Sequence, residues 1–298
     1  MTYINNNKIK GLGGIKRAYL NSTLIFQSFE KNVDKKYDIT AKFNVTSTTR
    51  PTSLCYSSAT SAFTEMYVDG VKIDVASGYT FNTTGEHTVN YMLADKTKIV
   101  NYSFSGCTSL TSVDILDSVK EIGREAFHSC KSLTEIIIPE SVTNIGFYAF
   151  SSCIGLTEIL IPDKVRFIGN GCFYNCSGLT SVAIGSGVTS IGLVAFNGCT
   201  SLTSVTIPSS VTSIGSSFKN CSGLTSVTIG SGVTSIGNAA FDGCIRLTEI
   251  TCLATTAPTL NGDVFVNLPT QGTLYIPNGS DYSTWTSILT TWTIQYIT

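Results

Sequence analysis

The sequence has few charged side chains and almost no histidine. Its 298 residues include 19 Lys and Arg, 20 Asp and Glu and 2 His, for a formal net charge of −1. This balance offers no electrostatic footprint for nucleic acid or for an anionic membrane surface. Residues 167–218 contain no charged side chain, so a site built on paired carboxylates would have to lie elsewhere. We therefore expect no nucleic-acid partner.

Long apolar runs are also missing. No run approaches the roughly 18–20 residues that a membrane-spanning helix requires. The first twenty residues, MTYINNNKIKGLGGIKRAYL, lack the charged-then-apolar order of a signal peptide. The sequence predicts no membrane span and no export signal in this chain.

Cysteine, in contrast, is frequent and periodic. Seven of the ten cysteines follow a phenylalanine by three residues, in the segments F104SGC, F127HSC, F150SSC, F173YNC, F196NGC, F218KNC and F241DGC. The phenylalanines are 23 residues apart, except for one gap of 22. A fixed period of about 20–29 residues is typical of a solenoid.

A complete unit shows how each coil is built. Residues 202–221 read LTSVTIPSSVTSIGSSFKNC, in which Val205 and Ile207 alternate with polar residues as in a strand. Pro208 then marks a turn, and a second apolar set leads to Phe218. The pattern predicts a strand, a turn, a second extended arm and a bend that contains the cysteine.

The repeat closely resembles the BspA-type leucine-rich repeat, whose consensus has the form LTxVxIPxSVTxIGxxAFxxC. The resemblance covers roughly residues 97–252. It implies a mainly β fold: a right-handed solenoid of about seven 23-residue repeats with a parallel sheet along one face. It also implies a bacterial surface adhesin, located at the cell surface or outside the cell.

The remaining segments divide the chain into four parts. Residues 1–37 are predicted to form a hairpin or attachment segment with a charged linker, through which the chain could oligomerise. Residues 38–96 contain short alternating runs and an Asp69-Gly70 turn signal, typical of a small β-sandwich or immunoglobulin-like domain, or of a cap on the first repeat. Residues 97–252 hold the repeats. Residues 253–298 are predicted to be a decayed repeat around Phe265 and a C-terminal cap.

The recurring cysteines are predicted to form a ladder of buried, unreactive thiols. Parallel coils place them about 4.8 Å apart with all side chains pointing the same way, whereas a disulfide needs two Cβ atoms aimed at each other. A tetrahedral zinc site needs four converging ligands, not a line of them. We therefore expect no metal and no cofactor. The ladder consists of Cys107, Cys130, Cys153, Cys176, Cys199, Cys221 and Cys244.

Outward positions of the repeat are the better candidates for function. Ile137 and Leu160 are apolar where the other coils are mostly polar, and Glu135 and Glu158 lie beside them on the same predicted strands. On the second arm, Phe147 occupies a position that is polar in most repeats, and the aromatic Tyr148 follows it. Exposed apolar clusters can mark contact surfaces. Neutral drift, or contact with the N-terminal domain, would explain these residues equally well.

Two functions fit these observations. The first is a non-catalytic recognition or adhesion protein that binds a protein or glycan ligand through the solenoid surface. The second is a structural or receptor-binding component of a phage or prophage particle, located in the virion and attached through residues 1–37. An enzyme is a distant third, because neither His87 nor His128 lies in a recognisable catalytic motif.

Overall fold

The computed structural model describes residues 2–4, 7–9, 18–20, 23–26 and 36–298, which belong to two compact units, 1–36 and 37–298. In the first unit, β1 (Thr2–Ile4) pairs antiparallel with β2 (Asn7–Ile9), and β3 (Ala18–Leu20) pairs antiparallel with β4 (Thr23–Phe26). The predicted linker at 30–36 lies, apart from Lys36, outside the described residues, so the attachment role of this segment stays a prediction.

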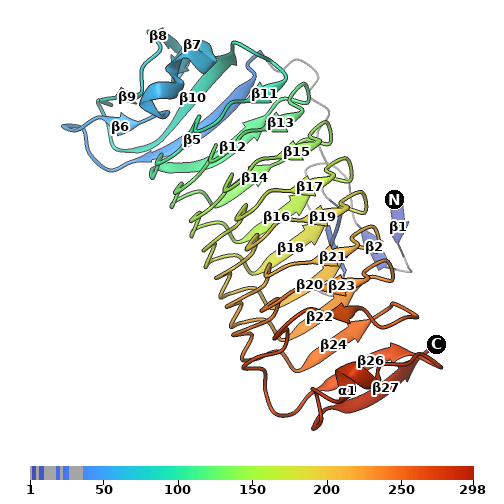
Figure 1. The fold of residues 1–298 in the computed structure, drawn as a ribbon. Helices are drawn as coiled ribbons and strands as arrows, with labels where there is room; N and C mark the ends of the chain where they lie inside the picture. Colours follow the sequence, from blue (N-terminus) through green and yellow to red (C-terminus); the bar gives the residue numbers. More distant parts are fainter. Residues whose placement is uncertain (1, 5–6, 10–17, 21–22, 27–35) are drawn as a thin grey trace. The chain divides into compact units, whose positions relative to one another are not determined.

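In the second unit, each solenoid coil contributes two short strands (Figure 1). The first strands are β12 (Leu110–Ile115), β14 (Glu135–Ile137), β16 (Glu158–Ile161), β18 (Ser181–Ile184), β20 (Ser204–Ile207), β22 (Ser226–Ile229), β24 (Glu249–Cys252) and β26 (Thr273–Pro277). The second strands are β11 (Lys98–Ile99), β13 (Glu121–Ile122), β15 (Asn144–Ile145), β17 (Phe167–Ile168), β19 (Ser190–Ile191), β21 (Ser213–Ile214), β23 (Ser235–Ile236) and β25 (Thr259–Leu260).

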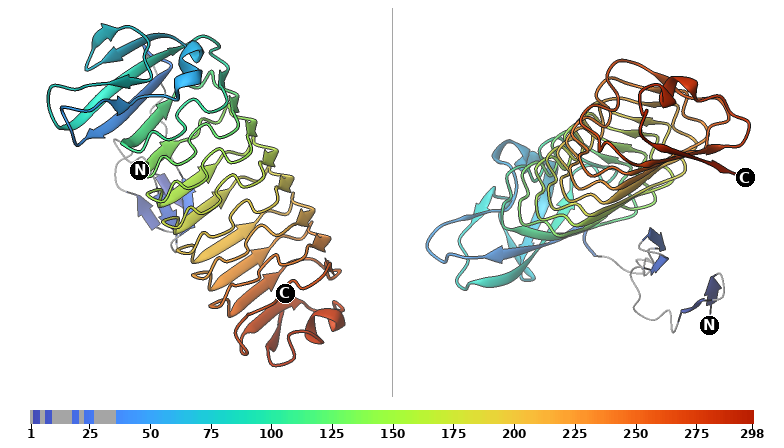
Figure 2. Two further views of the ribbon diagram at one scale, coloured as in Figure 1. Left: turned by 60° about the vertical axis from the view of Figure 1, so that its left-hand side comes forward. Right: turned by 90° about the horizontal axis from the view of Figure 1, so that it is seen from below.

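These strands form parallel ladders, and successive coils stack one on the next in both views of Figure 2. The second strands make one sheet of eight strands. The first-strand ladder is interrupted between β14 and β16 and again between β18 and β20. The prediction of a mainly β solenoid with a 23-residue repeat is confirmed.

A stack of phenylalanine rings runs through the core of the coils. Neighbouring ring centroids are 5.2–6.2 Å apart, and the angles between ring planes are 0–11°. The stack consists of Phe104, Phe127, Phe150, Phe173, Phe196, Phe218, Phe241 and Phe265. Because a parallel ladder repeats every 4.8 Å or so, equivalent residues lie above one another and share one continuous core. Phe265, which is 24 residues after Phe241, still joins the stack.

Close packing between coils explains the glycine after the second strand. A Cβ atom at position 146 would lie 2.6 Å from the backbone nitrogen of Arg124, and one at position 169 would lie 2.5 Å from the carbonyl oxygen of Gly146. Any larger residue would force the coils apart. The Ile-Gly pair in the repeat therefore marks where one coil approaches the backbone of the previous coil most closely.

Different aromatic residues close the two ends of the ring stack. At one end, Tyr91 meets Phe104 edge-on, with a centroid distance of 5.2 Å and an interplanar angle of 85°. At the other end, Trp285 meets Phe265 at 5.3 Å and 64°, and its Nε1 donates to the Pro258 carbonyl at 2.9 Å. Trp285 belongs to α1 (Ser283–Thr286), which leads to the last strand, β27 (Thr293–Ile297), parallel to β26.

Residues 37–96 continue the solenoid through shared main-chain hydrogen bonds. Their strands are β5 (Ile39–Val45), β6 (Thr52–Ser53), β7 (Phe63–Val68), β8 (Val71–Ile73), β9 (Gly78–Tyr79) and β10 (Gly85–Leu93), with a 3-10 helix at Ser57–Ala62. Strand β5 pairs antiparallel with β10 on one side and with β12 of the first coil on the other, giving the order β14-β12-β5-β10-β7-β8. Asp69 and Gly70 both have positive φ, 49° and 83°, and form the turn between β7 and β8. The edge of the first coil is thus covered by an antiparallel strand.

Candidate recognition surfaces

The outward residues of the first strands line up in two rows. Asp114 pairs with Ile137 and Ser112 with Glu135; two coils further on, Leu160 pairs with Ala183 and Glu158 with Ser181. The side chains of Ile137, Leu160, Glu135 and Glu158 are all half-buried. We call these four residues the sheet-face patch. It lies across the interruption between β14 and β16, where two apolar side chains follow one another in one row and two carboxylates in the other.

The rows extend beyond the repeats onto strands that the sequence did not connect to them. Thr40 pairs with Asp114, and Lys42 pairs with Ser112. Lys42 also forms an ion pair of 2.8 Å with Glu86, and Thr40 donates to Asn90 at 2.9 Å. The alternation in ITAKFNV (Ile39–Val45) predicted a strand with polar outward positions. The local sequence contains no signal that this strand pairs with β12. Thr40 and Lys42 are therefore additional surface residues of this face.

Phe147 and Tyr148 lie on a different part of each coil from the sheet-face patch. They follow the second strand β15, at the bend that leads to the buried Phe150. Phe147 is 44% exposed and packs edge-on against Phe167 at 6.2 Å. Tyr148 packs edge-on against Tyr174 at 6.5 Å. The structure thus divides the six candidate residues between two surfaces, four on first strands and two at the bend.

The cysteine ladder lies inside the coils, and all ten cysteines of the chain are buried and free. From Cys130 onward, each ladder thiol donates to the carbonyl oxygen of the phenylalanine in the preceding coil, at 3.0–3.2 Å. The same carbonyl accepts the amide of the cysteine in its own coil, as in the 3.2 Å bond from Cys130 to Phe127. The first member, Cys107, instead lies 3.8 Å from the Ser53 hydroxyl. A small thiol therefore fills space and bridges two coils at once.

Burial also sets the protonation state of these thiols. Desolvation raises the pKa of Cys107, Cys176 and Cys244 to about 12, and raises the pKa of Cys199 well above its ordinary value. The reactive form of cysteine is the thiolate. A thiol held protonated and out of contact with solvent is a poor nucleophile. The unreactivity of the ladder stays a prediction, which thiol labelling tests.

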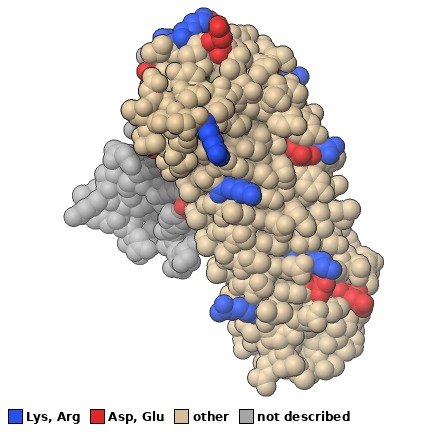
Figure 3. All heavy atoms as spheres, turned by 90° about the vertical axis from the view of Figure 1, so that its left-hand side faces the viewer, with Lys and Arg blue, Asp and Glu red and all other residues tan. Residues whose placement is uncertain are grey.

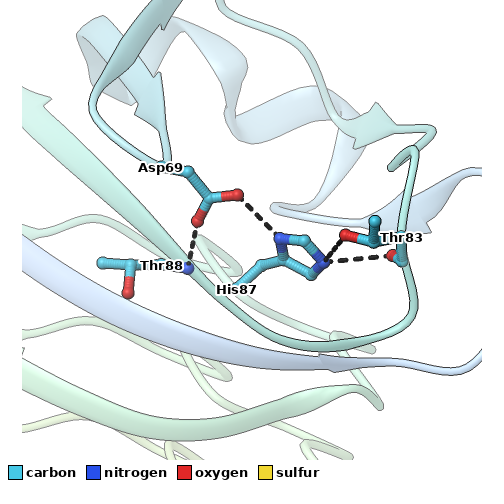
Figure 4. Close-up of polar contacts among 4 residues, drawn as sticks. All are labelled: Asp69, Thr83, His87 and Thr88. Carbon is cyan, nitrogen blue, oxygen red and sulfur yellow. Dashed lines mark hydrogen bonds and ion pairs between the residues drawn. The ribbon is translucent and has the colours of Figure 1, made fainter.

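His87 is the centre of a polar cluster that the sequence did not reveal (Figure 4). Its Nδ1 lies 2.7 Å from Asp69 Oδ2, and its Nε2 lies 3.2 Å from the Thr83 hydroxyl and 3.0 Å from the Thr83 carbonyl oxygen. Burial alone would raise the pKa of Asp69, but hydrogen bonds from His87 and from the Thr88 amide outweigh it and lower that pKa. Hydroxyl, imidazole and carboxylate therefore follow the order of a hydrolase triad.

Both ring nitrogens have partners within the fold. Nε2 lies within hydrogen-bonding distance of the Thr83 carbonyl oxygen as well as of the Thr83 hydroxyl, and the imidazole tautomer decides whether it donates or accepts there. The ring also packs against Phe81, with centroids 4.3 Å apart and an angle of 39° between the ring planes. We interpret the cluster as a clamp that ties the β7–β8 turn to the loop before β10.

Charge is sparse on the surface as well as in the sequence. The face drawn in Figure 3 shows only scattered Lys, Arg, Asp and Glu side chains. Within the described ranges, no group of three or more His, Cys, Asp or Glu side chains could hold a metal ion. In that same part of the chain, no helix is long and apolar enough to cross a membrane.

Comparison with known proteins identifies the repeats. A model of the BspA type leucine rich repeat region matches residues 97–217 and 215–284, in six copies. The chain belongs to the BspA-type leucine-rich repeat family. The match confirms the resemblance and extends past residue 252 into the predicted decayed repeat. No curated protein matches the sequence.

Several solved structures of leucine-rich repeat proteins are also similar to this BspA-type chain. A leucine rich repeat protein of T. pallidum is 32% identical, with a TM-score of 0.47, over 50% of this chain and 71% of that chain. A leucine-rich repeat protein of Bacteroides ovatus is 27% identical, with a TM-score of 0.32, over 52% of each chain. A leucine rich cell surface protein of Faecalibacterium prausnitzii is 25% identical, with a TM-score of 0.34, over 68% of this chain and 77% of that chain.

Proposed function

We propose that this protein is a non-catalytic recognition protein of a bacterial cell surface, which binds a protein or glycan ligand through the first-strand face of its solenoid. Membership of the BspA-type family supports an extended repeat scaffold. Recognition is then the role that such a scaffold performs best, because stacked coils present one long surface.

The sheet-face patch carries the proposal. Ile137 and Leu160 keep apolar surface toward solvent where Thr206 and Thr228 stand in later coils. Apolar side chains that stay partly open to water and lie in a row can mark a contact site. Glu135 and Glu158 add charge beside them, which favours one partner over another rather than adding much affinity. The antiparallel strands β5 and β10 widen this face on one side.

A bead-attachment experiment tests the proposal. Beads coated with the full chain are added to immobilised extracellular-matrix proteins and to cultured epithelial cells, and bound beads are counted. We expect attachment, and we expect the double variant Ile137→Lys, Leu160→Lys to lose most of it. The matched control is Thr206→Lys, Thr228→Lys, which places the same charges on the same row at later coils and should attach like the unmodified chain.

Two results would contradict the proposal in different ways. If unmodified beads attach to none of the surfaces, the adhesive function is wrong. If both double variants attach equally well, recognition does not use the sheet-face patch. Circular dichroism of each variant checks that the fold is retained.

A further inference from the structure

A second apolar surface lies at the bend of three consecutive coils. It consists of Phe147, Tyr148, Tyr174, Leu193 and Val194, which we call the bend stripe. Phe147 is 44% and Leu193 is 58% exposed. The coils are joined here by main-chain bonds of 2.9 Å, from Tyr148 to the Asn170 carbonyl and from Gly171 to the Leu193 carbonyl. The stripe is therefore continuous along the solenoid axis.

Two residues of the stripe adopt an unfavourable backbone conformation. Tyr148 has φ 55° and Val194 has φ 51°, in the left-handed region. The fold requires this conformation at the position, because Glu125, Gly171 and Ala239 share it in other coils. A left-handed conformation costs an ordinary residue roughly 1–2 kcal/mol, and it is rare for a β-branched one. Glycine or asparagine adopts this conformation at a lower free-energy cost. A bulky residue such as Tyr148 or Val194 therefore makes the folded protein less stable than glycine or asparagine would at the same position.

The aromatic rings of the stripe are held in place by their neighbours. Tyr148 packs edge-on against Tyr174 at 6.5 Å and 74°, and Phe147 packs against Phe167 at 6.2 Å and 81°. A Cβ atom at position 171 would collide with the Tyr148 ring, so Gly171 leaves the room that the ring occupies. Rings fixed before binding lose little conformational entropy when a ligand arrives.

The charge and size of the stripe restrict its occupant. No residue from 167 to 218 is charged, and in the coil before Phe147, Arg124 and Glu125 form an ion pair of 3.0 Å with each other. Three coils span about 10 Å along the axis, at roughly 4.8 Å per coil. A standard protein interface needs about 800 Å² from each partner. The stripe is too narrow for that and offers no charge to an ionic ligand.

We propose that the bend stripe binds a neutral glycan chain. Sugar rings combine apolar C–H faces, which pack on aromatic rings, with hydroxyl groups, which bond to polar neighbours such as Asn170. A linear chain also matches a narrow, uncharged platform. The stripe follows the second strands, whereas the sheet-face patch lies on first strands, so this binding does not depend on that patch.

Native electrophoresis through gels that contain dextran, yeast mannan, arabinogalactan or a soluble β-glucan tests the proposal. We expect at least one neutral polysaccharide to retard the full chain, equally at low and high salt, since no ionic contact is involved. Tyr148→Asn should weaken the apparent affinity about tenfold, as expected for a central aromatic contact. It should also leave the melting temperature unchanged or higher, because asparagine favours the left-handed conformation.

The matched control is Ala239→Asn, the same substitution at the same position of a later coil. It should migrate like the unmodified chain. Val194→Asn provides a second variant of the stripe, in which affinity should fall while stability does not. The Ile137→Lys, Leu160→Lys variant should be retarded normally, which separates this proposal from the one above.

The proposal is overturned if no gel retards the chain, or if Tyr148→Asn and Val194→Asn are retarded as strongly as Ala239→Asn. It is also overturned if retardation disappears at high salt, because the contact would then be ionic. A loss of melting temperature in Tyr148→Asn and Val194→Asn together would show that these side chains serve the fold.

Discussion

The inside of the solenoid repeats from coil to coil, whereas its outside does not. Seven successive coils place a phenylalanine and a cysteine at equivalent buried positions. On the outward row of the first strands, the residue changes from Asp114 to Ile137 to Leu160, and later to Thr206. The two regions experience different constraints. An interior residue must fit the coils on both sides of it, while an outward residue meets only solvent and a partner.

The stack explains why the interior tolerates so little change. The Phe173 ring lies between Phe150 at 5.4 Å and Phe196 at 5.2 Å, and all three are fully buried. Altering one ring therefore removes contacts from two neighbours. Interior substitutions should cost stability and leave recognition unchanged in the folded protein, whereas outward substitutions should do the reverse.

The largest expected effect of the interior is alkaline unfolding. The ladder thiols have folded-state pKa values raised from the ordinary 9.0, to about 12 for Cys107, Cys176 and Cys244. Because the folded pKa is raised, stability is fully present below pH 9 and is lost as the pH rises toward 12. Deprotonation of each thiol is easier in the unfolded chain throughout that window, so all seven ladder thiols act in the same direction and favour unfolding as the pH rises.

Far-UV circular dichroism as a function of pH, under reducing conditions, measures this effect. We expect a cooperative and reversible loss of β structure soon after the pH passes 9. A native spectrum retained close to pH 12 would show that the thiols do not limit stability. The two surfaces contain too few titratable groups to produce a comparable transition.

The next largest effect is expected from shortening one ring of the stack. Phe173→Ala removes a fully buried side chain from the middle of the solenoid and should lower the free energy of unfolding by about 3–5 kcal/mol. Phe147→Ala is the matched control, since the same change at a 44% exposed site should cost about 1 kcal/mol or less. Urea denaturation monitored by fluorescence gives both values. Equal losses at the two positions would remove the distinction between inside and outside.

The sequence predicted the interior well because every coil repeats the same evidence. Phe104 to Phe241 recur in phase, and so do the Ile-Gly pairs and the Ser, Asn or Gly before each cysteine. The structure shows why those small residues stand there: Ser129, Asn175 and Gly198 all have positive φ. The interpretation of each interior position in one coil was thus supported by the same residue type at the equivalent position of the other coils.

The surfaces were harder to predict because they depend on pairings between distant segments. The contact between β5 and β12, which places Thr40 beside Asp114, joins residues more than seventy positions apart. The Asp69–His87 contact likewise depends on the antiparallel pairing of β7 with β10. Neither pairing leaves a periodic signal. Phe147 and Tyr148 were visible in the sequence as departures from the repeat, but the exposure of Phe147 and the backbone conformation of Tyr148 required the structure.

A smaller interior effect is expected at a single cysteine. Cys199→Ala removes the 3.2 Å hydrogen bond from the thiol to the Phe173 carbonyl and leaves a small cavity, at a cost of about 1–2 kcal/mol. Cys199→Ser keeps a donor but buries a more polar group, so it should cost at least as much. In the unmodified chain, all seven ladder thiols should react slowly with a maleimide in the native state and fully in urea, with no mass change on reduction. Rapid native labelling of Cys199 would contradict the buried ladder.

The smallest effect on stability is expected on the outward row, where the effect on recognition should be largest. Ile137→Thr and Leu160→Thr give these coils the residue that Thr206 and Thr228 provide later in the same row. Threonine is a good strand former, and both positions are half-buried rather than buried. The double variant should therefore unfold within about 0.5 kcal/mol of the unmodified chain.

The same double variant should lose bead attachment, since it removes the apolar contact surface without adding charge. A drop in stability of several kcal/mol would instead show that Ile137 and Leu160 belong to the core, as their buried neighbours Ile136 and Ile159 do. These two side chains would then serve the fold and not recognition. The distinction between a conserved interior and a variable exterior of the coils would not hold at Ile137 and Leu160, the two apolar residues of the outward row.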